Sequence, residues 1–256
     1  KEMVKYGAKV LGGCCGTTPA YVAKLKEMVA TVNASVVKKK PRQLAVCTPL
    51  KTVVVDQPRI VGERINPTGK KRFKQALRDN DMNYILSQAI EQIDAGADIL
   101  DVNVGSPDID EKEMMVKVIK ALQAIVDVPL QIDSTKPEVL EAALRVYNGK
   151  PIVNSVNGEE EVLDTILPIV AKYGGAVIGL ALDENGIPPT AEGRVEIAKR
   201  IRDKAMSYGI PKEDIIIDCL TLTVSAEQKA AAETLKAMNI VKNELGLRTV
   251  LGVSNI

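Results

Sequence analysis

Short apolar runs alternate with amphipathic stretches from Pro58 to the end of the chain. The apolar runs are typical of strands buried on both faces, and they predict strands at residues 60–65, 99–104, 130–133, 152–156, 176–182, 215–219 and 249–254. The stretch after Asp81 is typical of the segments between them. It places several apolar residues at helical spacing on one face that we expect to join the core: Met82, Ile85, Leu86, Ala89 and Ile93.

Capping residues and glycines mark the expected helix boundaries. Two capping boxes and two single caps predict helix starts: Thr135 with Glu138, Ser225 with Gln228, Asp81, and Thr190. Three glycines predict helix ends: Gly96, Gly209 and Gly246.

Seven strand-then-helix units in sequence predict an α/β fold with a parallel sheet covered by helices. The number of units fits a (β/α)8 TIM barrel of which seven strands lie in this chain. A Rossmann-like open sheet is the alternative, but no Gly-x-Gly-x-x-Gly follows the first strand.

Three regions are expected along the chain. Residues 58–256 form the truncated barrel, and residues 1–35 form a separate piece with a strand at 9–11 and a helix at 19–32. Residues 36–57, which include the run Lys38-Lys39-Lys40-Pro41, are expected to be a solvated linker. Because the chain lacks an initiator Met and stops on a strand, we expect it to be a slice of a longer polypeptide.

Composition narrows the classes of function. The 34 Lys+Arg nearly balance the 33 Asp+Glu, and one Phe with no Trp leaves few stacking platforms, so neither nucleic acid nor a membrane surface is an expected partner. The absence of His removes imidazole catalysis and imidazole metal ligands. Four Cys, no leader and no apolar run of about 18 residues favour a reduced, cytoplasmic and soluble protein.

Carboxylates and carboxamides stand at the ends of the predicted strands. The set comprises Glu63, Asn66, Asp101, Asn103, Asp133, Asn154, Asn157, Asp183, Asp218 and Asn255. Period-two alternation places Asp101 with Asn103, and Gln131 with Asp133, on the inward face, where a parallel barrel forms its active-site mouth. The alternative for any one of them is an Asx turn or helix cap. A mouth without basic residues suits a neutral, donor-rich heterocycle better than a phosphorylated ligand.

Five segments of the sequence resemble, in order and spacing, the pterin-binding methyltransferase family. That family includes the folate domains of cobalamin-dependent methionine synthases and the methyltetrahydrofolate:corrinoid methyltransferases. The segments are VGERINPTG at 61–69, LDVNVG at 100–105, IDST at 132–135, IVNSVN at 152–157 and LGVSN at 251–255. The resemblance covers roughly residues 58 to 256.

The resemblance implies which residues hold a folate. Asp133, Asn154 and Asp218 would hydrogen-bond the pterin, and Asn255 would lie near the reacting N5 and assist catalysis. Three further residues would support the mouth: Asp101, Asn103 and Glu63. The methyl donor would be 5-methyltetrahydrofolate, and the acceptor would be the Co(I) form of cobalamin on another domain of the same or another chain.

Residues 11–19, with the sequence LGGCCGTTP, resemble the end of a zinc-binding homocysteine methyltransferase barrel. In that family Cys14 and Cys15 would ligate zinc together with a third, upstream Cys that this chain lacks. Because a catalytic zinc site needs three protein ligands, we expect two ordinary thiols in this chain and a homocysteine domain upstream of it.

Three functions follow for testing. The leading one is methyl transfer from 5-methyltetrahydrofolate to cobalamin within methionine synthesis, and the same transfer outside methionine synthesis is its close variant. The second is a folate-binding fragment without turnover. The third is an acid-mouthed lyase or aldolase, for which Lys136 is the nearest candidate for a Schiff base.

Overall fold

The computed structural model describes residues 2–32, 41–221 and 228–253. The chain divides into two compact units, Lys1–Arg42 and Gln43–Ile256. No helix in the described ranges is long and apolar enough to cross a membrane.

The first unit contains two helices, α1 (Glu2–Lys5) and α2 (Pro19–Ala30). Thr18 caps α2 by accepting a hydrogen bond from the backbone N–H of Tyr21, and Pro19 occupies the first turn, where its missing N–H costs nothing. The helix expected at 19–32 is therefore confirmed. The strand expected at 9–11 is wrong, because these residues have no neighbouring strand with which to pair among the described residues of this unit.

The second unit opens with an antiparallel hairpin of β1 (Ala45–Cys47) and β2 (Thr52–Val54). We expected a solvated linker over 36–57, and for the hairpin residues that expectation was wrong. Leu44, Val46 and Val53 are buried in a cluster with apolar residues of the main sheet. Burial of these side chains gives the short strands a reason to pair that the surrounding Lys and Pro residues do not suggest.

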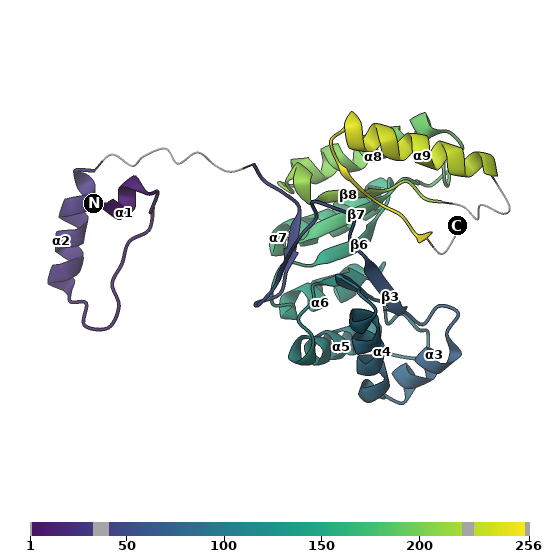
Figure 1. Ribbon diagram of the computed structural model, residues 1–256, viewed down its shortest axis with the longest axis horizontal. Helices are drawn as coiled ribbons and strands as arrows, with labels where there is room; N and C mark the ends of the chain where they lie inside the picture. Colours follow the sequence, from purple (N-terminus) through teal and green to yellow (C-terminus); the bar gives the residue numbers. More distant parts are fainter. Residues whose placement is uncertain (1, 33–40, 222–227, 254–256) are drawn as a thin grey trace. The chain divides into compact units, whose positions relative to one another are not determined.

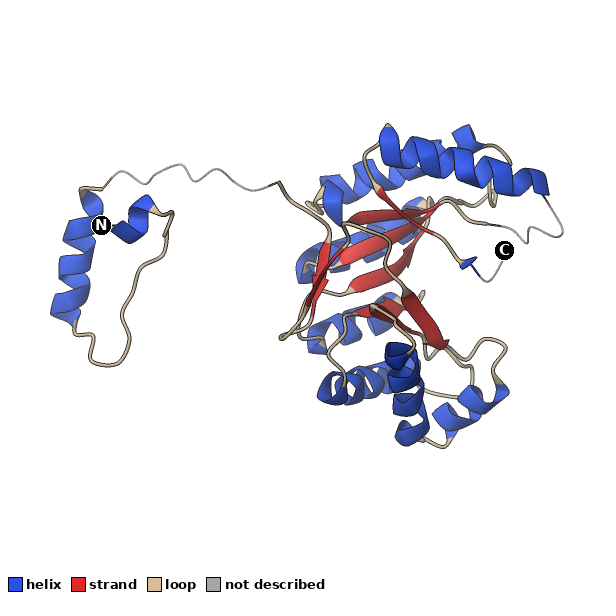
Figure 2. Ribbon diagram, in the orientation of Figure 1, coloured by secondary structure: helices blue, strands red, loops and turns tan. Residues whose placement is uncertain are grey.

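The main sheet has seven parallel strands in chain order. They are β3 (Val61–Ile65), β4 (Ile99–Val102), β5 (Leu130–Asp133), β6 (Ile152–Val156), β7 (Ala176–Leu180), β8 (Ile215–Asp218) and β9 (Arg248–Val250). Figure 2 shows them curling into part of a barrel. β3 and β9 are the two edges and do not pair with each other among the described residues, which confirms the prediction of an incomplete barrel. Four strands end earlier than expected, at residues 102, 180, 218 and 250 in place of 104, 182, 219 and 254, and residue 254 lies outside the described residues.

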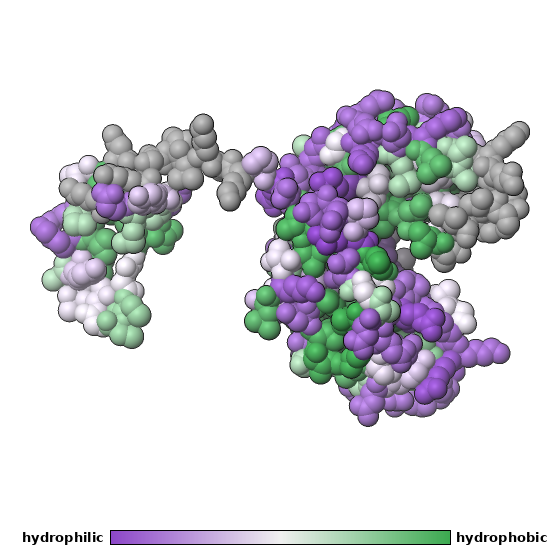
Figure 3. Space-filling view, viewed as in Figure 1, coloured by the Kyte–Doolittle hydropathy of each residue, from purple (hydrophilic) through white to green (hydrophobic). Residues whose placement is uncertain are grey.

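Helices cover the outside of this sheet (Figure 1). They are α3 (Lys71–Arg78), α4 (Met82–Asp94), α5 (Glu111–Ile125), α6 (Pro137–Val146), α7 (Glu160–Tyr173), α8 (Ala191–Ser207) and α9 (Gln228–Asn243), with a 3-10 turn η1 (Lys212–Asp214) before β8. The view in Figure 3 shows mostly hydrophilic side chains on the outer surface of α8 and α9. Each helix therefore buries one face and presents the other to water.

Of the four predicted helix starts, two are confirmed, one is wrong and one lies outside the described residues. Asp81 and Thr190 cap α4 and α8 as expected. The capping box of Thr135 with Glu138 was wrong, because α6 is preceded by Lys136, whose N–H donates to Oγ of Ser134. The box at Ser225 lies outside the described residues.

Alternation along the strands separates two apolar layers. Leu100, Val102 and Leu130 join the cluster under the helices, as expected from their register. The residues facing the barrel interior at its amino end join the hairpin cluster instead: Ile99, Ile152, Ile178 and Ile216. The hairpin therefore covers part of the amino end of the barrel, where Leu44 and these isoleucines line a cavity of about 500 Å³, and the carboxyl end carries the polar side chains.

Candidate functional site at the carboxyl ends of the strands

Asp101 on β4 lies at the centre of a buried hydrogen-bond network. Its Oδ1 accepts a 2.6 Å bond from Nε2 of Gln131 on β5 and a 3.2 Å bond from Nδ2 of Asn154 on β6. Asp101 is only 1% exposed. Its Oδ2 and the Oε1 of Gln131 are buried and have no hydrogen-bond partner among the described residues. The network is thus built from three adjacent strands and retains two unused acceptor atoms.

A second contact lies beside this network. Nδ2 of Asn103 donates to Oδ2 of Asp133 at 2.9 Å, while Oδ1 of Asn103 accepts from the backbone N–H of Gly105. Asp133 and Asn154 are partners in the register of β5 and β6, so their side chains leave the sheet on the same side. The structure therefore brings together four of the predicted site residues, Asp101, Asn103, Asp133 and Asn154, through hydrogen bonds or strand register.

Asp218 ends β8 at the same edge of the sheet. Its Oδ1 accepts a 2.8 Å bond from the backbone N–H of Leu220, which fixes the carboxylate. Leu220 has a φ of 59°, in the left-handed region that a residue with a Cβ seldom adopts. The loop after β8 is therefore held in an unusual conformation directly beside a predicted ligand-binding carboxylate.

Burial dominates the electrostatics of these acids. It raises the pKa of Asp101 to about 7, with a further rise from the neighbouring Asp133 carboxylate, against the lowering effect of its amide donors. Burial also raises the pKa of Asp133, and the bond from Asn103 opposes that shift. The pKa of Asp218 rises by burial as well, opposed by the Leu220 N–H. These groups ionise reluctantly and gain from any ligand that donates hydrogen bonds to them.

The rim of the mouth holds salt-bridged lysines, which corrects the expectation of a mouth without basic residues. Glu63 accepts from Nδ2 of Asn66, and Nζ of Lys70 lies 3.4 Å from its Oε2. Glu111 pairs with Nζ of Lys136 at 2.9 Å. Each lysine is matched to a carboxylate, so neither offers an unpaired charge to a phosphate.

Other predicted residues have local roles. Asn157 bonds to Glu159 and Asp183 lies in a turn with Gly186, so the Asx-turn alternative holds for these two. Asn255 lies outside the described residues.

The thiols of Cys14 and Cys15 belong to the other unit, where both residues are exposed and the sulfur atoms lie 3.8 Å apart. Within the part of the chain that the structure describes, no three His, Cys, Asp or Glu residues are grouped to hold a metal ion.

Sequence reasoning missed two members of the mouth. Gln131 was placed on the inward face but not in the site, although its amide joins Asp101 directly. Glu111 starts α5, and its Oε1 accepts from Oγ of Ser134 at 2.6 Å. The position of Gln131 within an otherwise apolar strand was the available signal for it; nothing in the sequence near Glu111 distinguishes it from an ordinary first-turn acid.

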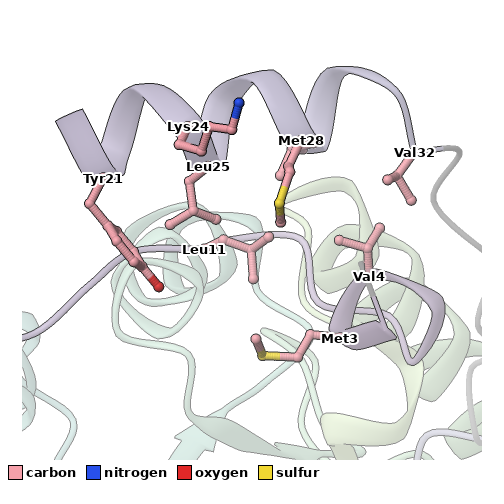
Figure 4. Close-up of a pocket in the computed structure, with 9 residues that line it drawn as sticks. Met3, Val4, Leu11, Tyr21, Lys24, Leu25, Met28 and Val32 are labelled. Carbon is pink, nitrogen blue, oxygen red and sulfur yellow. The ribbon is translucent and has the colours of Figure 1, made fainter. Parts of the chain in front are cut away.

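A separate apolar hollow of about 180 Å³ lies within the first unit. Figure 4 shows Tyr21, Leu25 and Met28 of α2 pointing toward Met3, Val4 and Leu11. This hollow is lined by none of the amide and carboxylate groups described above, so we do not place the functional site there.

Comparison with protein families agrees with this geometry. A family described as pterin binding enzyme matches residues 62–256, and a family described as homocysteine S-methyltransferase matches residues 1–29. The first covers the barrel with its polar mouth. The second covers the first unit up to α2.

Curated relatives match nearly the whole chain. Methionine synthase of Mycobacterium leprae is 33% identical over 272 residues, which cover 99% of this chain and 23% of the relative. Methionine synthase of Mycobacterium tuberculosis is 32% identical over 99% of this chain and 22% of its own length. The chain therefore spans less than a quarter of these relatives.

Solved structures support the barrel fold. A dihydropteroate synthase from Xanthomonas albilineans with 4-aminobenzoic acid has a TM-score of 0.62 at 20% identity, over 82% of this chain and 77% of that one. A dihydropteroate synthase from Coxiella burnetii in complex with pteroic acid has a TM-score of 0.61 at 22% identity, over 79% and 75% of the two chains.

Proposed function

Since this chain belongs to the family of pterin-binding enzymes, we propose that it binds 5-methyltetrahydrofolate at the carboxyl ends of its strands and offers the methyl group to Co(I) of cobalamin. The network of Asp101, Gln131 and Asn154, with two buried acceptor atoms unused, is the observation that carries the proposal. A reduced pterin has ring N–H and amino groups that such acceptors bind. The methionine synthase relatives support the choice of methyl transfer over other pterin chemistry.

In this proposal Asp133, Asn154 and Asp218 bind the pterin, and Asp101, Asn103 and Glu63 keep them in place. The contact of Asn103 with Asp133 and the bond of Asn154 to Asp101 support that division. Carboxylates that are half desolvated before the ligand arrives bind N–H donors strongly, because little further desolvation is needed.

The methyl group leaves N5 without its bonding electrons, which stay on nitrogen, and it forms a bond with the electron pair of Co(I). N5 must therefore be protonated or hydrogen-bonded as the methyl departs. With no His in the chain, we propose that the amide of Asn255 or a water molecule supports this proton, on the strength of the motif at 251–255.

The partners of the reaction are also proposals. Cobalamin would be carried by another domain, and homocysteine would be bound by a domain that includes residues 1–29. Cys14 and Cys15 would give zinc two ligands, one fewer than a catalytic site requires, so this chain alone is not expected to hold zinc. Four free cysteines among the described residues support a reducing, cytoplasmic setting for the proposal.

Two experiments test the proposal in order. Calorimetric titration of the chain with 5-methyltetrahydrofolate should show saturable binding, and single turnover with cob(I)alamin should then form methylcobalamin. Binding without methyl transfer would favour the folate-binding fragment, and no binding would reject the proposal.

The aldolase alternative is weakened by the state of Lys136. A Schiff-base lysine needs a lowered pKa, whereas the hydrogen bond and charge of Glu111 raise the pKa of Lys136.

A further inference from the structure

Arg194 on α8 is a buried cation whose contacts are directed at the loop after β8. The residue is 1% exposed. Its Nε donates to the carbonyl of Pro188, and its Nη1 lies 2.9 Å from the carbonyls of both Cys219 and Leu220 and 2.7 Å from Oγ1 of Thr234 on α9. One guanidinium therefore joins two helices to the chain that follows the strand.

These acceptors are all neutral. No carboxylate lies within ion-pair distance of Arg194 among the residues that the structure describes; burial lowers the pKa of Arg194, the charge of the nearby Glu233 opposes that shift, and Glu233 itself accepts a hydrogen bond from the Ala191 N–H. A buried charge without a carboxylate partner is a costly way to stabilise a fold, and an apolar side chain of similar size serves stability as well or better. What an apolar side chain cannot supply is a planar fork of donors that fixes several carbonyls at once.

The carbonyls that Arg194 holds belong to the loop that orients Asp218. Leu220 gives its carbonyl to Arg194 and its N–H to Oδ1 of Asp218, while its own φ of 59° is unfavourable for leucine. Thr234, 2% exposed, also contacts the Leu220 carbonyl at 3.0 Å. The conformation that aims the Leu220 N–H at the carboxylate is thus held by side chains of α8 and α9.

We propose that Arg194 is a positioning residue for pterin binding: it holds Leu220 in the left-handed conformation whose N–H fixes the Asp218 carboxylate toward the ligand. This inference rests on the proposed function for the identity of the ligand. It differs from that function in naming a residue that does not touch the ligand and a path, Arg194 to Leu220 to Asp218, through which it acts.

The test is a double-mutant cycle on the 256-residue chain. Affinity for 5-methyltetrahydrofolate is measured for Arg194→Met and Arg194→Lys, each with Asp218 and with Asp218→Ala, which removes the acceptor of the Leu220 N–H. Arg202→Met is the matched control, because Arg202 lies on the same helix and pairs with Asp203 at the surface. Hydrogen exchange at the Leu220 amide is followed in every variant.

We expect Arg194→Met to weaken folate binding about tenfold when Asp218 is present, and less than about twofold when Asp218→Ala has already been introduced. Exchange at the Leu220 amide should accelerate. Arg202→Met should leave both readouts unchanged. Equal losses in the two backgrounds would show that Arg194 acts on the fold in general and would overturn the proposal, as would wild-type affinity in Arg194→Met.

Arg194→Lys keeps the charge and the aliphatic stem, so it tests the role of Arg194 in folate binding if the Arg194→Met variant does not fold. Its ammonium lies one bond closer to the backbone than Nη1 and cannot bind the Pro188 carbonyl and the Nη1 acceptors together, so its affinity should stay about threefold or more below that of the unaltered chain. Full affinity in Arg194→Lys would overturn the role of the fork. If the unaltered chain does not bind folate, the proposed function fails, and the exchange of the Leu220 amide still decides whether Arg194 holds the loop.

Discussion

The two ends of the barrel interior are built from the same strands and differ completely in chemistry. On three of the strands an inward isoleucine at the amino end is followed, two positions further along, by a polar residue: Ile99 by Asp101, Ile152 by Asn154, and Ile216 by Asp218. Because side chains alternate along a strand, each pair faces the same interior at two depths. Each of these three strands therefore contributes an apolar residue to the amino end of the interior, which we call the floor, and a polar residue to the carboxyl end, which we call the mouth.

The floor and the mouth differ in whether their side chains carry buried polar atoms that lack a hydrogen-bond partner. At the floor, the inward isoleucines cluster with the hairpin residues Leu44 and Val46, and together with Leu44 they line a cavity of about 500 Å³. In the mouth, Oδ2 of Asp101 and Oε1 of Gln131 are buried without a partner among the described residues. The packed floor supplies the stability with which a layer of incompletely paired groups can be tolerated.

The hairpin is attached to the floor by close backbone contacts. Cys47 and Lys150 exchange both backbone hydrogen bonds, and the hydroxyl of Tyr147 donates to the Cys47 carbonyl. A Cβ at Gly149 would lie 2.1 Å from that same carbonyl oxygen, and Gly149 has a φ of 142°. Only glycine allows the hairpin to approach this closely.

The largest effect is expected at the floor. Leu44→Ala should lower the free energy of unfolding by about 3 kcal/mol, because it removes a buried side chain and leaves a cavity in a closely packed cluster. Denaturant unfolding measures the loss, and Leu50→Ala in the exposed hairpin turn is the control. Folate affinity of the folded protein should change less than about twofold, since floor and mouth occupy different depths. A large loss of affinity with intact folding would contradict the separation.

In the polar mouth, substitutions should lower the affinity for folate and not the free energy of unfolding. Asp133→Asn and Asp218→Asn each remove a charged acceptor with little change in shape, so folate affinity should fall by about 1.5–3 kcal/mol. The free energy of unfolding should stay the same or increase, because both carboxylates are destabilised by burial. Asp94→Asn, at the exposed end of α4, serves as the control in the titration. Unchanged affinity in both mouth variants would place the ligand elsewhere.

The contributions of the floor and the mouth to the free energy of unfolding should also depend differently on pH. Burial raises the pKa of Asp101 from an ordinary 3.8 to about 7, so between these values the folded chain holds a proton that the unfolded chain releases. The free energy of unfolding therefore falls as the pH rises through this window, by at most about 1.4 kcal/mol per pH unit for one proton.

Asp101→Asn isolates this contribution, because its amide oxygen still accepts from Gln131 and Asn154. Urea unfolding between pH 4 and pH 7 should give a flatter pH dependence in the variant than in the unaltered chain. Identical slopes in the two proteins would mean that Asp101 ionises normally. Leu44→Ala provides the comparison, since it should lower stability equally at every pH.

The floor and the mouth were not equally predictable. Residues 130–133 and 152–156 were predicted with their observed bounds, because a strand buried on both faces is an apolar run that needs no knowledge of its neighbours. The hairpin was missed, because its strands have three residues each and are stabilised by side chains more than 40 positions away, such as Ile99 and Ile152.

Within the site, alternation predicted which acids face inward but not what they contact. The bond from Asn154 to Asp101 joins residues 53 positions apart and depends on the stagger of the strands. Arg194 could not have been predicted, because an arginine on an amphipathic helix is expected to face water. Its burial becomes evident only when the loop after β8 is folded against α8.

The smallest effect is expected at the rim above the polar mouth, where Lys136 pairs with Glu111. The Lys136 side chain is 56% exposed, and the Glu111 side chain, 9% exposed, keeps its hydrogen bond from Ser134, so Lys136→Met should lower the free energy of unfolding by about 1 kcal/mol, the upper end for an exposed pair. Folate affinity and the rate of methyl transfer should remain within about twofold of the unaltered chain, because Ser134 still donates to Glu111 and the acids of the mouth keep their own donors. Lys136→Arg is the control that keeps the charge. Loss of activity in Lys136→Met that Lys136→Arg does not restore would point to an amine nucleophile, because guanidinium cannot form a Schiff base. That result would move the chemistry from the polar mouth to its rim.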